Sequence, residues 1–96
     1  MYLHLGLDKV VRLDEVVGIF DMEKSTISKF SRQFLADAEK GGRIVNVAQD
    51  LPKSYIVCVD KDKNETVYIS QISPSTLRRR AGYIDGLSES FAGNED

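Results

Sequence analysis

Residues 55–72, YIVCVDKDKNETVYISQI, decide the fold. Five apolar residues come first, a polar stretch follows at residues 60–65, and a second β-rich run occupies residues 66–72. Two such runs joined by a short charged turn predict an antiparallel hairpin. The first strand is apolar on both faces, so each face needs a cover. We expect the chain's own core to cover one face and a neighbouring subunit to pack at Tyr55, Val57 and Val59.

The N-terminal part predicts further strands. Residues 2–6 alternate, with Leu3 and Leu5 on one face and polar or aromatic side chains on the other. Residues 9–12 and 16–20 are rich in β-branched residues. The three residues between these two runs are short enough for a hairpin, so we expect the two runs to pair with each other.

An amphipathic helix is predicted between these strands and the hairpin. Ser25 or Thr26 can cap its N-terminus, and Gly41-Gly42 ends it. One apolar stripe recurs at three- and four-residue spacing and consists of Ile27, Phe30, Phe34, Leu35 and Ala38. Residues 43–47 read as a strand, and residues 48–53 as a loop.

The stretch ISPSTLRRRAG, residues 72–82, predicts a short C-terminal helix. Ser73 can cap it, Pro74 suits its first position and Gly82 ends it. The order of strands, helix, strands and short helix predicts an α+β fold with a mostly antiparallel sheet. We expect residues 1–82 to form a single domain, and residues 83–96 to form an acidic, partly mobile tail.

The composition bounds the class of protein. Ninety-six residues suit one domain, and no apolar run approaches the roughly 20 residues that span a bilayer. The N-terminus lacks the features of a signal peptide. Cys58 is the single cysteine and lies in an apolar run, which fits a reducing compartment. We therefore expect a cytoplasmic protein without a membrane partner.

No catalytic or metal-binding constellation is found in the sequence. His4 is the single histidine and lies on a different predicted strand from Cys58, so the ligands of a structural zinc site are missing. The acidic turn at residues 60–65 lacks the central glycine and the ligand spacing of a calcium loop. We expect a protein that is not an enzyme and needs no cofactor or metal.

The run Arg78, Arg79 and Arg80 is the feature of the sequence that most suggests a binding surface. Cations in the last turn complement the helix dipole, so the three could simply be a solvated helix end. Successive helical residues point about 100° apart, so three in a row fan around the axis. A broad anionic surface such as a phosphate backbone could use all three, and so could a subunit interface. The acidic residues of the tail leave residues 1–82 mildly basic, which permits any of these roles.

Four segments together carry a resemblance: MYLHLG at residues 1–6, VVGIFD at 16–21, PKSYIV at 52–57 and ISPSTLRRRA at 72–81. In this order and spacing the sequence resembles the Rem family of small bacterial extracellular-matrix regulatory proteins, over about residues 1–82. The resemblance implies a non-enzymatic regulator of biofilm matrix expression in the cytoplasm of a Gram-positive bacterium. A related branch of the family binds promoter DNA and assembles into rings.

The sequence departs from that related branch at two places. The branch carries an arginine just before the strand that matches residues 16–20, and an arginine pair before the strand that matches residues 55–59. Here those positions read Glu15 and Leu51-Pro52, and only Lys53 keeps a positive charge in the second loop.

Two functions remain open at this point. The first is a homo-oligomeric, DNA-associated regulator, with a ring as one possible assembly. It would contact phosphates of double-stranded DNA through basic residues, and not base edges. The second is a module that binds a protein partner, such as a related regulator, without touching DNA. The residues that would contact DNA are Arg78, Arg79, Arg80, Lys53, Arg12 and Lys9.

Overall fold

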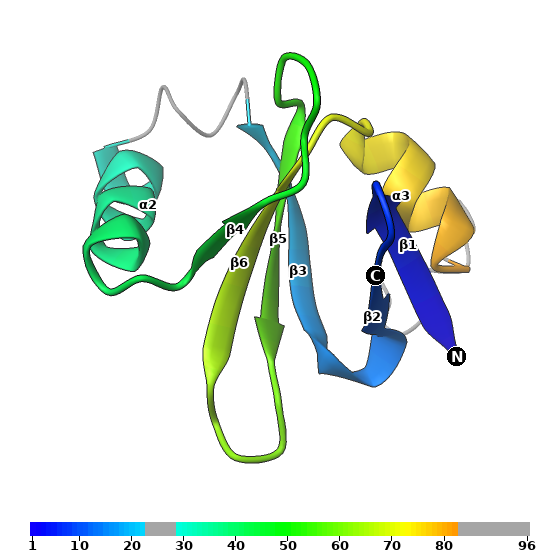
Figure 1. Cartoon of the computed structure of the whole chain (residues 1–96), viewed down its shortest axis with the longest axis horizontal. Helices are drawn as coiled ribbons and strands as arrows, with labels where there is room; N and C mark the ends of the chain where they lie inside the picture. The colour runs from blue at the N-terminus through cyan, green and yellow to red at the C-terminus, as the bar shows by residue number, and fades with distance from the viewer. Residues whose placement is uncertain (23–28, 83–96) are drawn as a thin grey trace.

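The computed structural model describes residues 1–22 and 29–82 (Figure 1). Within these ranges the elements are β1 (Tyr2–Gly6), β2 (Lys9–Arg12), the 3-10 turn η1 (Leu13–Glu15), β3 (Val16–Asp21), α2 (Lys29–Lys40), β4 (Ile44–Asn46), β5 (Ser54–Val59), β6 (Glu65–Ser70) and α3 (Pro74–Arg80). Helices and mostly antiparallel strands confirm the predicted α+β class.

The four-stranded sheet has the order β3-β5-β6-β4. Strands β5 and β6 pair antiparallel from Ser54↔Ser70 to Val59↔Glu65, which confirms the hairpin predicted from residues 55–72. Asp60 shapes the turn, because its Oδ1 accepts hydrogen bonds from the main-chain N–H groups of Asp62 at 2.8 Å and Asn64 at 3.0 Å. Strand β4 adds to the far side of β6 in the parallel direction.

The hairpin predicted between residues 9–12 and 16–20 is wrong. Strand β2 pairs with β1, with Leu3 opposite Val11, and the two form a separate two-stranded sheet. The reversal lies earlier, at Gly6 (φ 136°) and Leu7 (φ 51°). A leucine with positive φ is uncommon, so a tight turn centred on this residue was not predicted. Turn η1 then carries the chain from the small sheet to β3, at the edge of the large one.

Both faces of β5 are covered by the chain itself (Figure 1). The β1–β2 sheet and α3 cover one face, where Ile56 and Cys58 join the larger core cluster. Helix α2 lies on the other face, where Tyr55 and Val57 are only 4% and 7% exposed. No neighbouring subunit is therefore needed to cover the two faces of this strand. The sequence could not reveal that the two helices lie on opposite faces.

Helix α2 covers its face of the sheet incompletely. Ala38 is buried, while Phe34 and Leu35 are half-buried against the smaller core cluster. Phe30, predicted to belong to the same buried stripe, is 87% exposed, so that part of the prediction is wrong. The predicted caps at residues 25–26, and Ile27, lie outside the described residues.

Helix α3 forms as predicted. The Ser73 hydroxyl accepts a hydrogen bond from the Thr76 main-chain N–H at 3.3 Å, and Pro74 occupies the first turn. Leu77 is fully buried and fixes the helix to the core. Gly82 has a φ of 88°, which glycine adopts without a Cβ clash. The predicted tail at residues 83–96 lies outside the described residues, and no helix in the described ranges is long and apolar enough to cross a membrane.

Candidate functional site

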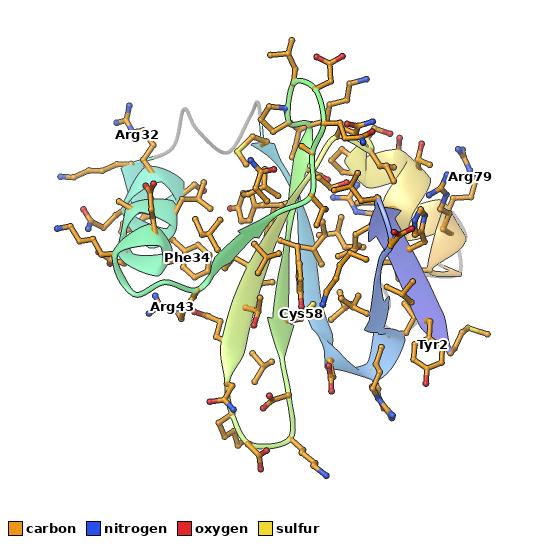
Figure 2. All side chains as sticks on the ribbon, in the orientation of Figure 1. Tyr2, Arg32, Phe34, Arg43, Cys58 and Arg79 are labelled. Atoms are coloured by element: carbon orange, nitrogen blue, oxygen red, sulfur yellow. The ribbon has the colours of Figure 1, made fainter. Side chains whose placement is uncertain are left out.

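Arg79 projects from the outer side of helix α3 (Figure 2), and Arg78 and Arg80 beside it are exposed as well. Pro74 and Leu77 are buried, so the side of the helix that carries them faces the core. Successive residues turn by about 100°, which places Arg79 opposite that buried side and the other two arginines on its flanks. The fan predicted from the sequence is present, and all three side chains are exposed.

Arg78 already has a structural partner. Its Nη2 donates a hydrogen bond to the main-chain carbonyl oxygen of Ile19, 3.0 Å away. Ile19 belongs to β3, an edge strand of the four-stranded sheet. One edge carbonyl is thus satisfied by a cation from α3.

Unlike Arg78, Arg79 and Arg80 make no hydrogen bond to another element among the described residues. Arg79 makes a long contact of 3.5 Å from Nη2 to the hydroxyl of Thr76, one turn earlier on the same exposed helix. In the part of the chain that the structure describes, neither arginine forms an ion pair. Two guanidinium groups on a fixed helix, without carboxylate partners among these residues, can accept an anionic ligand.

Lys53 and Lys9 do not join this surface. The main-chain N–H of Lys53 donates to the Ser70 carbonyl at 2.8 Å, which places Lys53 close to the start of α3. The arginines occupy the other end of the helix, about 6–9 Å further along its axis. The Lys9 Nζ lies 5.2 Å from the centre of the Tyr68 ring, between the small sheet and the large one. That half-buried ammonium is held by a cation–π contact.

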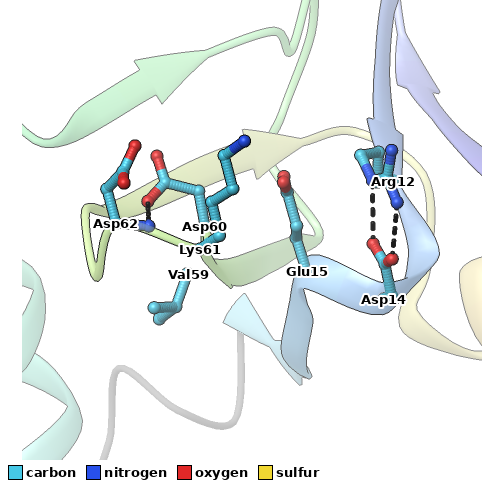
Figure 3. A pocket seen from close by; sticks show the side chains of 7 residues that line it. All are labelled: Arg12, Asp14, Glu15, Val59, Asp60, Lys61 and Asp62. Carbon is cyan, nitrogen blue, oxygen red and sulfur yellow. Dashed lines mark hydrogen bonds and ion pairs between the residues drawn. The ribbon is translucent and has the colours of Figure 1, made fainter.

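Arg12 lies in an acidic cavity of about 690 Å³. Its guanidinium binds both carboxylate oxygens of Asp14, at 2.7 and 3.0 Å, and holds the pKa of that carboxyl below its ordinary value. Figure 3 shows this pair facing a wall formed from the β5–β6 turn. The cavity is lined by Arg12, Asp14, Glu15, Val59, Asp60, Lys61 and Asp62. Four carboxylates against two cations disfavour a phosphate there.

The six basic residues predicted to bind DNA are therefore not gathered on one surface. Arg78, Arg79 and Arg80 share the exposed end of α3, whereas Lys9 and Arg12 lie at the two ends of β2 and Lys53 lies just before β5. Val59, predicted at an interface, is half-buried at the rim of the acidic cavity.

The single cysteine is a core residue. Cys58 is buried in the larger core cluster, and this burial raises the pKa of its thiol to about 11. The His4 Nε2 lies 2.7 Å from the Leu7 carbonyl oxygen in the exposed turn after β1. Among residues 1–22 and 29–82, no three His, Cys, Asp or Glu side chains lie close enough together to bind a metal ion.

The structure also contains an apolar groove that we did not predict. Its volume is about 400 Å³, and it runs between the N-terminal half of α2 and strand β3. The Phe20 ring stacks on the Tyr55 ring, with centroids 4.9 Å apart, and forms its floor. The sequence offered one sign of it, because β3 is apolar on both faces. The groove is lined by Val17, Phe20, Phe30, Ser31, Phe34, Tyr55, Val57 and Glu65.

Comparison with known proteins agrees with the sequence motifs. The model of a family described as "RemA-like: Extracellular matrix regulatory protein A-like" matches residues 2–81. The chain is 37% identical over 84 residues to the extracellular matrix regulatory protein B of Bacillus subtilis (strain 168). That alignment covers 88% of this chain and 94% of the relative, so nearly the whole of each protein is compared. The chain therefore belongs to the RemA-like family of extracellular matrix regulatory proteins, as its four motifs predicted.

Proposed function

We propose that this chain regulates the expression of extracellular matrix genes in the bacterial cytoplasm, as a non-catalytic homo-oligomer that associates with double-stranded DNA. The regulatory role rests on the family and on the name of the Bacillus relative. The DNA association rests on the surface of α3. A protein with this role needs neither a cofactor nor a metal.

One observation carries the DNA proposal: Arg79 and Arg80 extend from a helix whose buried side is fixed by Leu77. Arginine binds phosphate oxygens with two parallel N–H donors. The two side chains diverge by about 100°, so they fit successive phosphates better than the edge of one base. The expected binding mode is contact with the DNA backbone, which depends little on sequence.

A single copy offers few such contacts. Each phosphate that a cation neutralises releases counterions from the DNA, and this release favours binding. The more phosphates are contacted, the more steeply the affinity falls as the salt concentration rises. Copies joined in one assembly would bind the same duplex through several α3 helices, and the affinity of the assembly would far exceed that of one copy. The homo-oligomer thus provides what the short arginine surface lacks.

The apolar groove favours a second candidate function. Phe30 is 87% exposed and Val17 is 67% exposed, so the groove presents apolar surface that a protein partner could cover. In this alternative the chain binds a related regulator and does not contact DNA itself. Replacement of the arginines would then leave DNA association of the pair unchanged.

The two candidates are separated by fluorescence anisotropy with a labelled duplex. We expect Arg79→Ala/Arg80→Ala to weaken binding to promoter and unrelated duplexes alike. The slope of log affinity against log salt should fall by about one unit per lost contact. The matched control is Lys61→Ala/Lys63→Ala, which removes the same charge from the exposed β5–β6 turn. Equal affinities and salt slopes for both double variants and the wild type would contradict the DNA proposal.

A further inference from the structure

The apolar groove between α2 and β3 needs an occupant. Three of its apolar lining residues are exposed: Phe30 at 87%, Val17 at 67% and, on the floor, Phe20 at 40%. Isolated apolar residues are common on protein surfaces, but three that line one groove with a stacked aromatic floor form a continuous patch. The volume of about 400 Å³ lies within the range of ligand pockets, about 300–1,000 Å³.

The chemistry of the groove restricts what can occupy it. The Glu65 carboxylate at one edge is paired with Arg43, Oε1 to Nε at 3.1 Å. The basic side chains in the first turns of α2, Lys29 and Arg32, lie on the side of the helix away from the groove and do not line it. Because Glu65 is already paired with Arg43 and the other lining residues are uncharged, the groove suits an occupant with apolar anchors.

The C-terminal sequence of this chain has that composition. Ile84, Leu87 and Phe91 follow one another at spacings of three and four, the interval that places side chains on one side of a helix. The residues around them are acidic or small, and the segment contains no Lys or Arg. This is the pattern of a peptide that inserts an apolar stripe into a groove.

A chain cannot place this stripe in its own groove. Helix α3 lies with the β1–β2 sheet, on the face of the large sheet opposite to α2 (Figure 1). Ile84 is two residues beyond Gly82, and two residues span at most about 7 Å. If all three anchors are used together, the groove must belong to another copy.

We propose that the segment of residues 84–91 docks in the α2–β3 groove of a neighbouring copy, with Phe91 packed against Phe30. This names a contact that holds the copies together, and so rests on the homo-oligomer proposed above. The arginines of α3 take no part in the contact and remain available for DNA.

Disulfide trapping on the full chain tests the docking directly. Phe30→Cys and Phe91→Cys are made separately, one with a larger tag, then mixed and oxidised. Phe30 is exposed, so its replacement should not disturb folding, and the native Cys58 is buried. We expect a mixed disulfide between the two tagged chains in at least severalfold excess over a control pair. The control pairs Phe91→Cys with Leu51→Cys, which replaces a residue that is 77% exposed in the loop before β5.

Each outcome is decisive. Equal yields for the two pairs would overturn the proposal. A disulfide within one chain of the Phe30→Cys/Phe91→Cys variant, in place of one between chains, would overturn the assignment to a neighbour. Trapping of Phe30→Cys with itself alone would indicate that two grooves face each other instead.

A second measurement keeps the docking separate from the function proposed above. Leu87→Ala/Phe91→Ala should raise the dissociation constant of the assembly about tenfold or more in sedimentation, as loss of central anchors does. The control, Ser88→Ala/Ser90→Ala, should leave it unchanged. If the assembly is unaffected while the wild type binds DNA, the docking fails and the proposed function stands. If the mixed disulfide forms but the wild type binds no duplex, the docking stands and the proposed DNA association fails.

Discussion

Arg78 donates a hydrogen bond from Nη2 to the carbonyl oxygen of Ile19 at 3.0 Å, and this bond ties helix α3 to the edge strand β3. The arginine run is thereby divided. One guanidinium supports the fold, and the two that follow it face outward without ion-pair partners among the described residues. The run is therefore neither wholly a solvated helix end nor wholly a ligand surface.

This division predicts different effects on stability. Arg78→Ala should lower the free energy of unfolding by about 1 kcal/mol, because an intramolecular hydrogen bond is lost. Arg79→Ala should change it by less than about 0.5 kcal/mol, as exposed substitutions usually do. Urea denaturation of both variants measures the difference. Equal midpoints would show that the contact with Ile19 contributes nothing to stability.

Helix α2 offers a matched pair of aromatic residues. Phe34 is half-buried, with its ring centroid 6.3 Å from that of Tyr55, whereas Phe30 is 87% exposed. A fully buried phenylalanine costs about 3–5 kcal/mol when truncated, so Phe34→Ala should cost about 2 kcal/mol. Phe30→Ala should cost less than about 0.5 kcal/mol in the isolated chain. Denaturation at a concentration where the chain is monomeric checks both values, and a larger loss for Phe30 would contradict the observed helix phase.

Gly18 gives the Phe20 ring its place on Tyr55. A Cβ atom at Gly18 would lie 2.5 Å from Cε2 of Phe20, so Gly18→Ala must displace the ring. The stacked pair would then be lost, at a cost of about 1 kcal/mol. If the ring is the cause, Gly18→Ala should be nearly harmless when Phe20→Ala is already present. If the effects of the two substitutions are additive in this double-mutant cycle, the clash with the Phe20 ring is not the cause.

The buried thiol predicts a pH dependence. Burial raises the pKa of Cys58 from 9.0 to about 11. Below pH 9 the thiol is protonated in the folded and the unfolded state alike. Between pH 9 and about 11 it ionises mainly in the unfolded chain, so the free energy of unfolding falls as pH rises. The fall should be steeper in the wild type than in Cys58→Ala, measured by urea denaturation from pH 8 to 11. Parallel curves would mean that the thiol is not protected from ionisation.

Local signals predicted the elements well. The β5–β6 hairpin and α3 follow from runs, caps and turn residues that act within a few positions, such as Ser73 before Pro74. The pairing of β2 with β1 depends instead on the positive φ of Leu7, a conformation that leucine rarely adopts and that its residue type does not predict. The position of Phe30 depended on where α2 meets the sheet, which is a long-range property.

The candidate surfaces were only partly predictable. The arginine run was visible, because neighbouring residues on one short helix stay neighbours in space. The engagement of Arg78 was not, since its partner Ile19 is 59 residues away along the chain. The same holds for Lys9 on the Tyr68 ring and for the β5–β6 turn that faces Arg12, whereas the ion-pair partner of Arg12, Asp14, is its near neighbour in the sequence. A list of basic residues from a sequence cannot show which of them are already neutralised.

Light scattering of the purified chain, with and without a promoter-length duplex, measures oligomerisation and DNA association together. We predict an assembly larger than a dimer at micromolar concentration. At low salt this assembly should gain the mass of the duplex, and at physiological salt it should bind less of it. If the chain remains monomeric and the duplex does not change its mass at either salt concentration, both the proposed homo-oligomer and its association with DNA are wrong.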